Sequence, residues 1–265
     1  LEHALAHHPA FLDRLRVLWK DDRIELLGGA FHDPVLTSIP ERDAMGQIQY
    51  TSNFYEQHFG RRPQGAWLCL RAWDSALIRV LAEAGIRYTL LDDAQFVVAG
   101  LHPDSLKGYY TTERDGQTLN VFPIDHDLVR SVQGQDRDGI VATLGALGGR
   151  HGGVDGVEVF AGDGQLLMSQ GRLGDFLSLL RQEYLWVKTY PLQTAMKLYR
   201  SRGRVYLPTS ADPELGDWSR PADTVKRRRL FMREMEAMGV KEEAQQFAGG
   251  VIFDNFLVKY PEVNR

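Results

Sequence analysis

The feature that most constrains the fold is a short apolar stretch with the sequence GAWLCLRAW, residues 65–73. Pro63 precedes it, and Asp74 and Ser75 follow it at the start of a helical pattern over residues 76–84. An apolar run of this length between turn residues is typical of a buried strand, which here leads directly into a helix. A strand followed by a helix is the unit of an α/β fold, in which functional residues gather at the carboxyl ends of the strands.

Arg71 and Trp73 lie at the predicted carboxyl end of this strand, and their side chains allow two interpretations. They can bind a polar ligand with flat apolar faces, such as a sugar. Alternatively, the arginine pairs with a carboxylate and the tryptophan fills the core. This stretch by itself favours the second interpretation.

Apolar runs and helical patterns alternate along the chain, and this alternation predicts an α/β fold. The predicted strands occupy residues 22–31, 64–70, 86–91, 156–162 and 204–208. Helical patterns cover residues 1–19 with a break at Pro9, 40–59, 76–84, 140–147, 173–180, 184–199 with an interruption at Pro191, and 223–247. A structural β-hairpin is expected over residues 109–124, turning at Asp115 and Gly116. The five strands are expected to lie parallel, with their carboxyl ends on one face.

Composition and charge exclude several classes of function. The chain has 31 Lys and Arg against 35 Asp and Glu, a net charge of −4, which gives no electrostatic basis for binding nucleic acid or an anionic membrane. No apolar run approaches the length of a membrane span. The one cysteine, Cys69, excludes an intrachain disulfide and indicates a reducing, cytoplasmic location. His3 and His7 have a metal-ligand spacing but no acidic or cysteine partner, so we expect no metal and no cofactor.

The stretch at residues 65–73 resembles the nucleophile motif of glycoside hydrolase family 57, the family of α-amylases and 4-α-glucanotransferases. The family pattern is approximately G-x-W-L-x-E-R-x-W. Its residues are matched here by Gly65, Trp67, Leu68, Arg71 and Trp73. Leu70 stands where the family has its catalytic glutamate.

Two further stretches resemble family motifs that end in acidic residues. Residues 25–34 are similar to E-L-L-G-G-x-x-x-E-P, with Asp33 in place of the last glutamate, although an Asp-Pro pair is equally a turn signal. Residues 88–96 are similar to Y-x-x-L-D-D-x-H-F. They keep both aspartates, Asp92 and Asp93, and have glutamine in place of the histidine.

A third stretch, residues 156–164, resembles the motif that contains the family's general acid/base. Asp163 stands at the position of that aspartate, although its neighbours differ from the family pattern and an Asp-Gly pair is commonly only a turn. Residues 204–210 resemble I-Y-L-P-T-A-S, and residues 249–264 resemble a motif of the family's helical region. The resemblance therefore extends over the whole chain in the family's order.

The resemblance implies a (β/α) barrel of the seven-stranded glycoside hydrolase type. It also implies that the first strand, which holds a histidine motif in the family, is missing at the N-terminus. We expect residues 1–210 to form a catalytic-like barrel domain and residues 211–265 to form a helical region packed on it. The implied partner is an α-glucan or maltooligosaccharide, and a homo-oligomer is left open.

Retaining glycoside hydrolysis needs two carboxyl groups about 5–5.5 Å apart, and leucine cannot replace the nucleophile. The resemblance implies that Asp163 and Leu70 occupy the catalytic positions. It also implies substrate binding by Asp33, Trp67, Arg71, Trp73, Asp92 and Asp93. Three functions follow: a catalytically impaired homologue, an active hydrolase or glucanotransferase that uses a substitute carboxylate, or a non-catalytic protein that binds glucan or supports an assembly.

Overall fold

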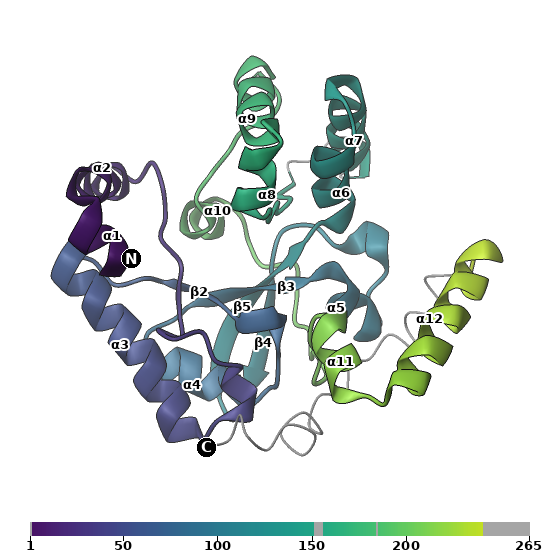
Figure 1. Cartoon of the computed structure of the whole chain (residues 1–265), viewed down its shortest axis with the longest axis horizontal. Helices are drawn as coiled ribbons and strands as arrows, with labels where there is room; N and C mark the ends of the chain where they lie inside the picture. The colour runs from purple at the N-terminus through teal and green to yellow at the C-terminus, as the bar shows by residue number, and fades with distance from the viewer. Residues whose placement is uncertain (1, 151–155, 184, 241–265) are drawn as a thin grey trace.

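A five-stranded sheet forms the centre of the molecule in a computed structural model that describes residues 2–150, 156–183 and 185–240 (Figure 1). The strands are β1 (Gly28–Gly29), β2 (Gly65–Trp67), β3 (Tyr88–Asp92), β4 (Tyr110–Arg114) and β5 (Gln117–Ile124). Their order across the sheet is β1-β2-β3-β5-β4. The first four strands in this order are parallel, and β4 is antiparallel to β5.

The predicted strands and the observed sheet agree in the first half of the chain. Strands β1, β2 and β3 lie within or beside the predicted runs and are parallel, as expected. The predicted hairpin is also present, as β4 and β5. However, β5 pairs along its length with β3 in parallel, with Leu90 opposite Phe122, so the hairpin belongs to the main sheet. This role of residues 117–124 was not predicted.

The strands predicted at residues 156–162 and 204–208 are wrong. The first segment accepts single backbone hydrogen bonds, from Gly108 to Val157 and from Asp125 to Val159. Gly108 precedes β4 and Asp125 follows β5, so these two bonds do not continue into a regular ladder between residues 156–162 and either strand. The second segment forms only an isolated bridge between Arg204 and Thr111. Within the described residues the sheet therefore has two edges, β1 and β4, and the structure establishes a mixed α/β fold.

Helices surround the sheet, and their ends follow the local sequence. In chain order they are α1 (Glu2–His7), α2 (Pro9–Lys20), α3 (Glu41–Phe59), α4 (Leu77–Glu83), α5 (Asp93–Val98), α6 (His126–Gly134), α7 (Arg137–Arg150), α8 (Gly164–Ser169), α9 (Arg172–Gln182), α10 (Leu192–Leu198), α11 (Pro213–Ser219) and α12 (Ala222–Ala237). Pro9 begins α2, which produces the predicted break. Gly60 ends α3 with φ 73°, in the left-handed region that glycine adopts freely.

Two predicted helices differ from the structure. Within its described residues, the helix predicted over residues 184–199 is confined to α10. Pro191 precedes α10 as the N-cap, and residues 185–190 are not helical. The helix predicted over residues 223–247 is present as α12 but ends at Ala237, and residues 238–240 are not helical. Residues 241–247 and the motif at 249–264 lie outside the described residues. Among the described helices, none combines the length and the apolar character that a membrane crossing requires.

Alternation along the central strands supplies apolar side chains to both faces of the sheet. Leu119 and Val121 of β5 pack with α3 and α4 on one face, while Phe122 and Ile124 contact Tyr88 on the other. A separate apolar cluster joins α6, α7 and α9, which Figure 1 shows beside one another above the sheet.

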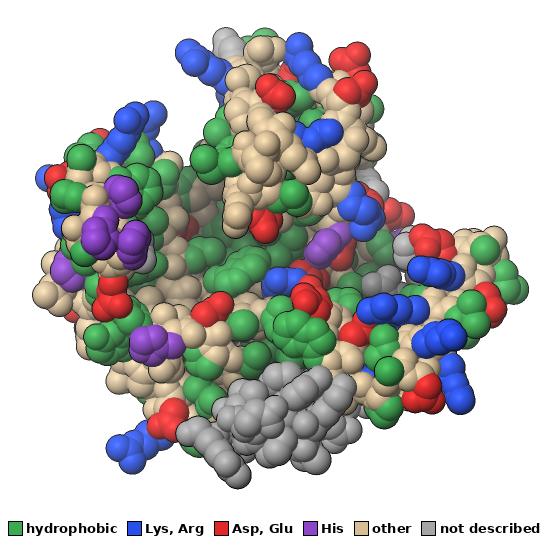
Figure 2. Space-filling view, in the orientation of Figure 1, with side chains coloured by type: hydrophobic (Ala, Val, Ile, Leu, Met, Phe, Trp, Pro, Cys, Tyr) green, Lys and Arg blue, Asp and Glu red, His purple; other side chains and the backbone are tan. Residues whose placement is uncertain are grey.

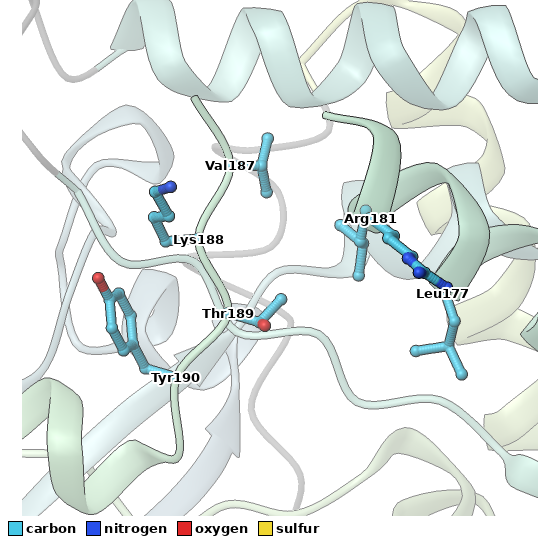
Figure 3. A pocket seen from close by; sticks show the side chains of 7 residues that line it. Leu177, Arg181, Val187, Lys188, Thr189 and Tyr190 are labelled. Atoms are coloured by element: carbon cyan, nitrogen blue, oxygen red, sulfur yellow. The ribbon is translucent and has the colours of Figure 1, made fainter. Parts of the chain in front are cut away.

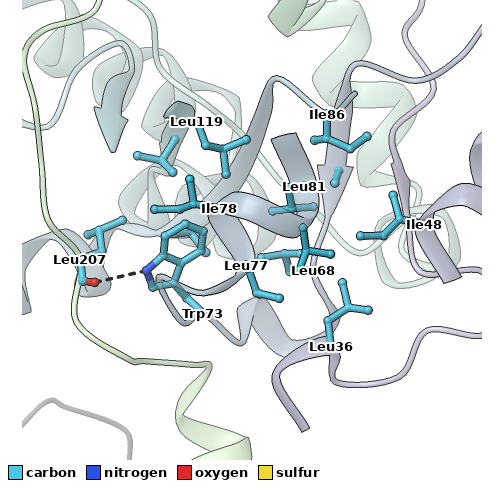
Figure 4. Packing of buried hydrophobic residues seen from close by; sticks show 14 of the residues in the cluster. Leu36, Ile48, Leu68, Trp73, Leu77, Ile78, Leu81, Ile86, Leu119 and Leu207 are labelled. Atoms are coloured by element: carbon cyan, nitrogen blue, oxygen red, sulfur yellow. Dashed lines mark hydrogen bonds between the residues drawn. The ribbon is translucent and has the colours of Figure 1, made fainter. Parts of the chain in front are cut away.

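Trp73 is at the centre of the core on the α3 and α4 side, with 0% of its surface exposed. Figure 4 shows its ring between Leu77, Ile78 and Leu207, and its indole Nε1 donates a hydrogen bond to the Leu207 carbonyl at 3.3 Å. The predicted contact of Trp73 with substrate is therefore incompatible with its position. For this residue the core interpretation is correct.

Candidate functional site at the carboxyl ends of the strands

The chain leaves β2 through a tight turn, the 3₁₀ helix η2 (Cys69–Arg71). Leu70 and Arg71 have φ angles of 51° and 46°, in the left-handed region that residues other than glycine seldom adopt. A distant part of the chain stabilises the turn, because the backbone N–H of Asp212 donates a hydrogen bond to the Leu70 carbonyl at 2.8 Å. Strained backbone of this kind persists only where surrounding contacts enforce it, and it is concentrated at functional sites.

Arg71 connects three parts of the chain. Its Nε atom lies 3.1 Å from each carboxylate oxygen of Asp92, and its terminal nitrogen pairs with Asp212, the N-cap of α11. Its guanidinium carbon lies 5.6 Å from the centroid of the Trp67 ring, within cation–π range. Arg71 is thus the paired cation that one interpretation predicted, and it lies just beyond the carboxyl end of β2.

Asp92 ends β3, and its neighbour Gln95 ties this strand end to the turn after β2. The Gln95 side-chain oxygen accepts a hydrogen bond from the Asp92 backbone at 2.9 Å. Its amide nitrogen donates to the Arg71 carbonyl at 3.1 Å and to the Ser210 hydroxyl at 2.8 Å. Gln95, which stands where the resembled motif has histidine, therefore fixes the backbone around Arg71.

His126 begins α6 immediately after β5 and approaches both aspartates. Its backbone N–H and its ring Nδ1 lie 3.2 Å and 3.0 Å from the two carboxylate oxygens of Asp93. Its Nε2 lies 3.6 Å from an oxygen of Asp92. The hydrogen bond to Asp93 raises the pKa of His126, more than burial lowers it. Sequence reasoning missed His126 because residues 117–124 were interpreted as a structural hairpin and not as a strand with a functional carboxyl end.

The two aspartates respond differently to this environment. Burial raises the pKa of the Asp92 carboxyl, an effect that Arg71 and His126 oppose without reversing. Burial also acts on Asp93, but its hydrogen bonds with His126, the charge of that imidazole and the hydrogen bond from the Ala94 backbone together outweigh burial and lower the pKa of this carboxyl. Adjacent carboxylates with opposite shifts are typical of a site whose protonation states are set by its neighbours.

Asp33 and Leu70 flank the cluster on the β1 side. Asp33 has φ 51°, and its carboxylate interacts with the thiol of Cys69, while burial raises the pKa of both groups. Leu70 is half-buried and packs on the small apolar cluster of Ala72, Ala211 and Leu215. The side chain at the resembled nucleophile position therefore packs against apolar side chains beside a charged cluster.

Asp163 lies apart from these contacts. It is exposed, and it caps α8 by accepting a hydrogen bond from the Leu166 backbone at 3.0 Å. Four residues earlier, Val159 is bonded to Asp125 beside the end of β5, so the backbone of Asp163 can lie no more than about 14 Å from Val159. None of the described side-chain contacts joins Asp163 to the aspartates of β3 or to His126.

The site is thus a polar cluster beyond the carboxyl ends of the parallel strands, which we name the strand-end cluster. It is made by Arg71, Asp92, Asp93, His126 and Asp212. Figure 2 shows acidic, basic and histidine side chains gathered beside a hollow that lies between α1–α2 and α8–α10. Carboxylate acceptors beside a guanidinium, an imidazole and a partly exposed indole suit hydroxyl groups on a ring with apolar faces. Across the described part of the chain, no group of three or more acidic, histidine or cysteine residues forms a metal site.

A separate shallow pocket of about 360 Å³ lies between α9 and residues 187–190. Figure 3 shows Leu177 and Arg181 on one side of it and Lys188 and Tyr190 on the other. These residues come from different elements than the strand-end cluster.

The fold and the cluster define an α/β protein with a polar site at the carboxyl ends of parallel strands, the arrangement of many enzymes that act on small polar molecules. The sequence matches the Glycosyl hydrolase family 57 over residues 1–140. It is 32% identical over 273 residues to the 4-alpha-glucanotransferase of Thermococcus litoralis, with 100% of this chain aligned to 41% of that protein. It is 29% identical over 268 residues to alpha-amylase 1 of Dictyoglomus thermophilum, with 97% of this chain aligned to 39% of that protein.

The crystal structure of the 4-alpha-glucanotransferase from Thermococcus litoralis superposes on this chain with a TM-score of 0.85 at 30% identity. The superposition covers 100% of this chain and 41% of that one. The chain therefore belongs to glycosyl hydrolase family 57. It spans about two fifths of the length of these relatives.

Proposed function

We propose that this chain binds α-glucan at its strand-end cluster and that its hydrolytic and transfer activities are impaired. The observation that carries the proposal is Leu70, the residue at the family's nucleophile position. Leucine has no lone pair with which to attack an anomeric carbon, and no charge with which to stabilise an oxocarbenium ion. Loss of a nucleophile commonly lowers turnover on the order of 10³-fold or more.

The proposed ligand class follows from the family and from the chemistry of the cluster. The relatives include an alpha-amylase and a 4-alpha-glucanotransferase, and both names refer to α-glucans. In our proposal Asp33, Asp92 and Asp93 accept hydrogen bonds from sugar hydroxyls, and the ring of Trp67 packs on a sugar face. Arg71 fixes the carboxylates of Asp92 and Asp212, with which it pairs. Asp163 occupies the acid/base position without a partner carboxylate at residue 70.

We further propose that the observed sheet is part of a seven-stranded (β/α) barrel, with residues 1–210 as the catalytic-like domain and residues 211–265 as a helical region packed on it. The likeness to the Thermococcus litoralis enzyme over the whole chain supports this arrangement. The pairing of Asp212 with Arg71 supports a close contact between the two regions.

The test is incubation of the purified chain with maltoheptaose, with products followed by chromatography and binding measured by calorimetry. We expect binding without turnover, and weaker binding after Trp67→Ala. Turnover by the unchanged protein that disappears in Asp163→Asn would overturn the proposal in favour of a substitute carboxylate. Absence of binding would overturn the glucan assignment.

A matched pair of variants tests the position of Leu70. Leu70→Glu introduces the missing carboxylate, and Leu70→Gln introduces a side chain of the same size without charge. We expect measurable turnover of maltoheptaose from the first variant and none from the second, because only the carboxylate can form the glycosyl intermediate. Equal behaviour of the two variants, with both correctly folded, would argue against residue 70 as the nucleophile position.

A further inference from the structure

His126 occupies a distinctive place in the strand-end cluster, because it alone among the described side chains contacts both Asp92 and Asp93. Asp93 fixes one end of the ring. Its carboxylate accepts a hydrogen bond from the His126 backbone N–H at 3.2 Å and lies 3.0 Å from the ring Nδ1. The other ring nitrogen faces Asp92 at 3.6 Å. The His126 side chain is 34% exposed, so one part of the ring remains open to solvent.

We propose that His126 is a positioning residue for glucan binding, whose protonated ring holds the carboxylates of Asp92 and Asp93 in the orientation that accepts sugar hydroxyls. This inference rests on the function proposed above. A protonated imidazole donates from both nitrogens, so it can satisfy one carboxylate on each side. A neutral imidazole donates from one nitrogen only. With Nδ1 donating to Asp93, the unprotonated Nε2 then faces Asp92 as a second acceptor.

The charged groups that face His126 determine the direction of the effect. Asp93 and Asp92 favour the protonated ring, and Arg71 opposes it from the turn after β2. Asp212 forms an ion pair with Arg71. The pKa of His126 is raised above its ordinary value, so the ring loses its proton on the alkaline side of about pH 6.5. Glucan affinity is therefore expected to fall as the pH rises through this range.

The experiment measures the affinity of the full 265-residue chain for maltoheptaose by calorimetry from about pH 5.5 to pH 9. We expect the affinity of the unchanged protein to fall about fivefold across this range, the size typical of one partly exposed ionic contact. His126→Asn keeps a donor near the position of Nδ1 but cannot titrate, so its profile is expected to be flat. His126→Gln, with a donor near the position of Nε2, provides a second non-titrating variant.

His102 offers a matched control, because it is a histidine beside an aspartate outside the cluster. Its Nδ1 lies 3.7 Å from a carboxylate oxygen of Asp104 and accepts a hydrogen bond from the Asp104 backbone N–H at 3.3 Å. Both side chains are exposed. His102→Asn is expected to keep the pH profile of the unchanged protein. Circular dichroism of each variant establishes that it is folded before its affinity is compared.

The outcomes distinguish this inference from the proposed function. If the unchanged protein binds and both folded His126 variants keep its pH profile, His126 is not the positioning residue. If the unchanged protein binds no maltoheptaose at any pH, the proposed function fails together with the role of His126 in glucan binding. In that case the thermal unfolding of His126→Asn against pH still tests the ion-pair contact, and an unchanged pH dependence would exclude it.

Discussion

Asp92 and Asp163 make the same local structure in two different environments. Each follows an extended segment and occupies the N-cap position of a short helix, α5 and α8 respectively. Asp92 has a side chain that is 7% exposed and is contacted by Arg71 and His126. Asp163 is exposed, and its described hydrogen bond is to its own helix.

The difference comes from the neighbours of each segment. Asp92 ends β3, which lies between β2 and β5, so the residues that follow those strands converge on it. The segment before Asp163 belongs to no strand and makes isolated hydrogen bonds to Gly108 and Asp125. An aspartate after an extended run therefore becomes part of a cluster only where the residues that follow neighbouring strands lie close enough to contact it.

Among the variants that test the difference between Asp92 and Asp163, Arg71→Met is expected to have the largest effect. The variant leaves the Asp92 carboxylate buried without its cation, and we expect the free energy of unfolding at pH 7 to fall by about 3 kcal/mol. The loss should be smaller at pH 4, because the pKa of Asp92 is already raised by burial and the carboxyl then becomes neutral. Urea denaturation at both pH values measures the change.

Arg79→Met is the control for this prediction. Arg79 forms an ion pair with Glu41, and both side chains are about half exposed. Such surface pairs contribute little to stability, so the control is expected to unfold like the unchanged protein. Equal losses in the two arginine variants would mean that the strand-end cluster is energetically no different from the surface.

The sequence allowed much of the sheet to be predicted, because short apolar runs before turns and helices are local signals. Strands β2 and β3, the hairpin turn at Asp115 and the break at Pro9 follow from such signals. The parallel pairing of β5 with β3 does not, because both hairpin strands and parallel strands are short apolar runs and the choice of partner depends on the whole fold. The family resemblance also gave no indication of this pairing.

The candidate site was predicted only in part, for a related reason. Asp92, Asp93 and Arg71 stand at strand ends that the sequence located, and the structure brings them together. His126 follows a strand that was assigned a structural role, and Asp212 reaches Arg71 from a distant part of the chain. Trp73 had the residue type of a sugar-binding side chain, but residue type alone cannot separate an exposed ring from a buried one.

A smaller effect is expected at the other aspartate of the comparison. Asp163→Ala removes the side chain that caps α8, and loss of such a cap typically costs about 1 kcal/mol. Asp163→Asn is expected to cost less, because asparagine is also a good N-cap residue. Urea denaturation of both variants is the measurement. A loss as large as that of Arg71→Met would show that Asp163 has partners of the kind that Asp92 has, and the contrast between the two would fail.

The smallest expected effect concerns the pH dependence of stability that Asp92 and Asp93 produce together. The folded-state pKa of Asp93 is lowered, so its contribution is present above its unfolded pKa, about 3.9, and is lost as the pH falls through the folded value. The folded-state pKa of Asp92 is raised, so its contribution is present below about 3.9 and is lost as the pH rises through the folded value. The two contributions therefore run in opposite directions with pH and partly cancel.

Stability measurements alone will consequently show little of this behaviour, and direct titration is needed. Carbon-detected NMR of ¹³C-labelled aspartate, with signals assigned from Asp92→Asn and Asp93→Asn, follows each carboxyl group separately. We expect Asp93 to gain its proton at a lower pH than Asp92, and His126→Asn to move the two titrations closer together by removing the imidazolium that favours ionised Asp93. The reverse order, with Asp92 the more acidic group, would mean that Arg71 dominates over burial at the end of β3. The cluster would then be a structural ion pair in which Arg71, and not burial, sets the direction of the Asp92 pKa shift.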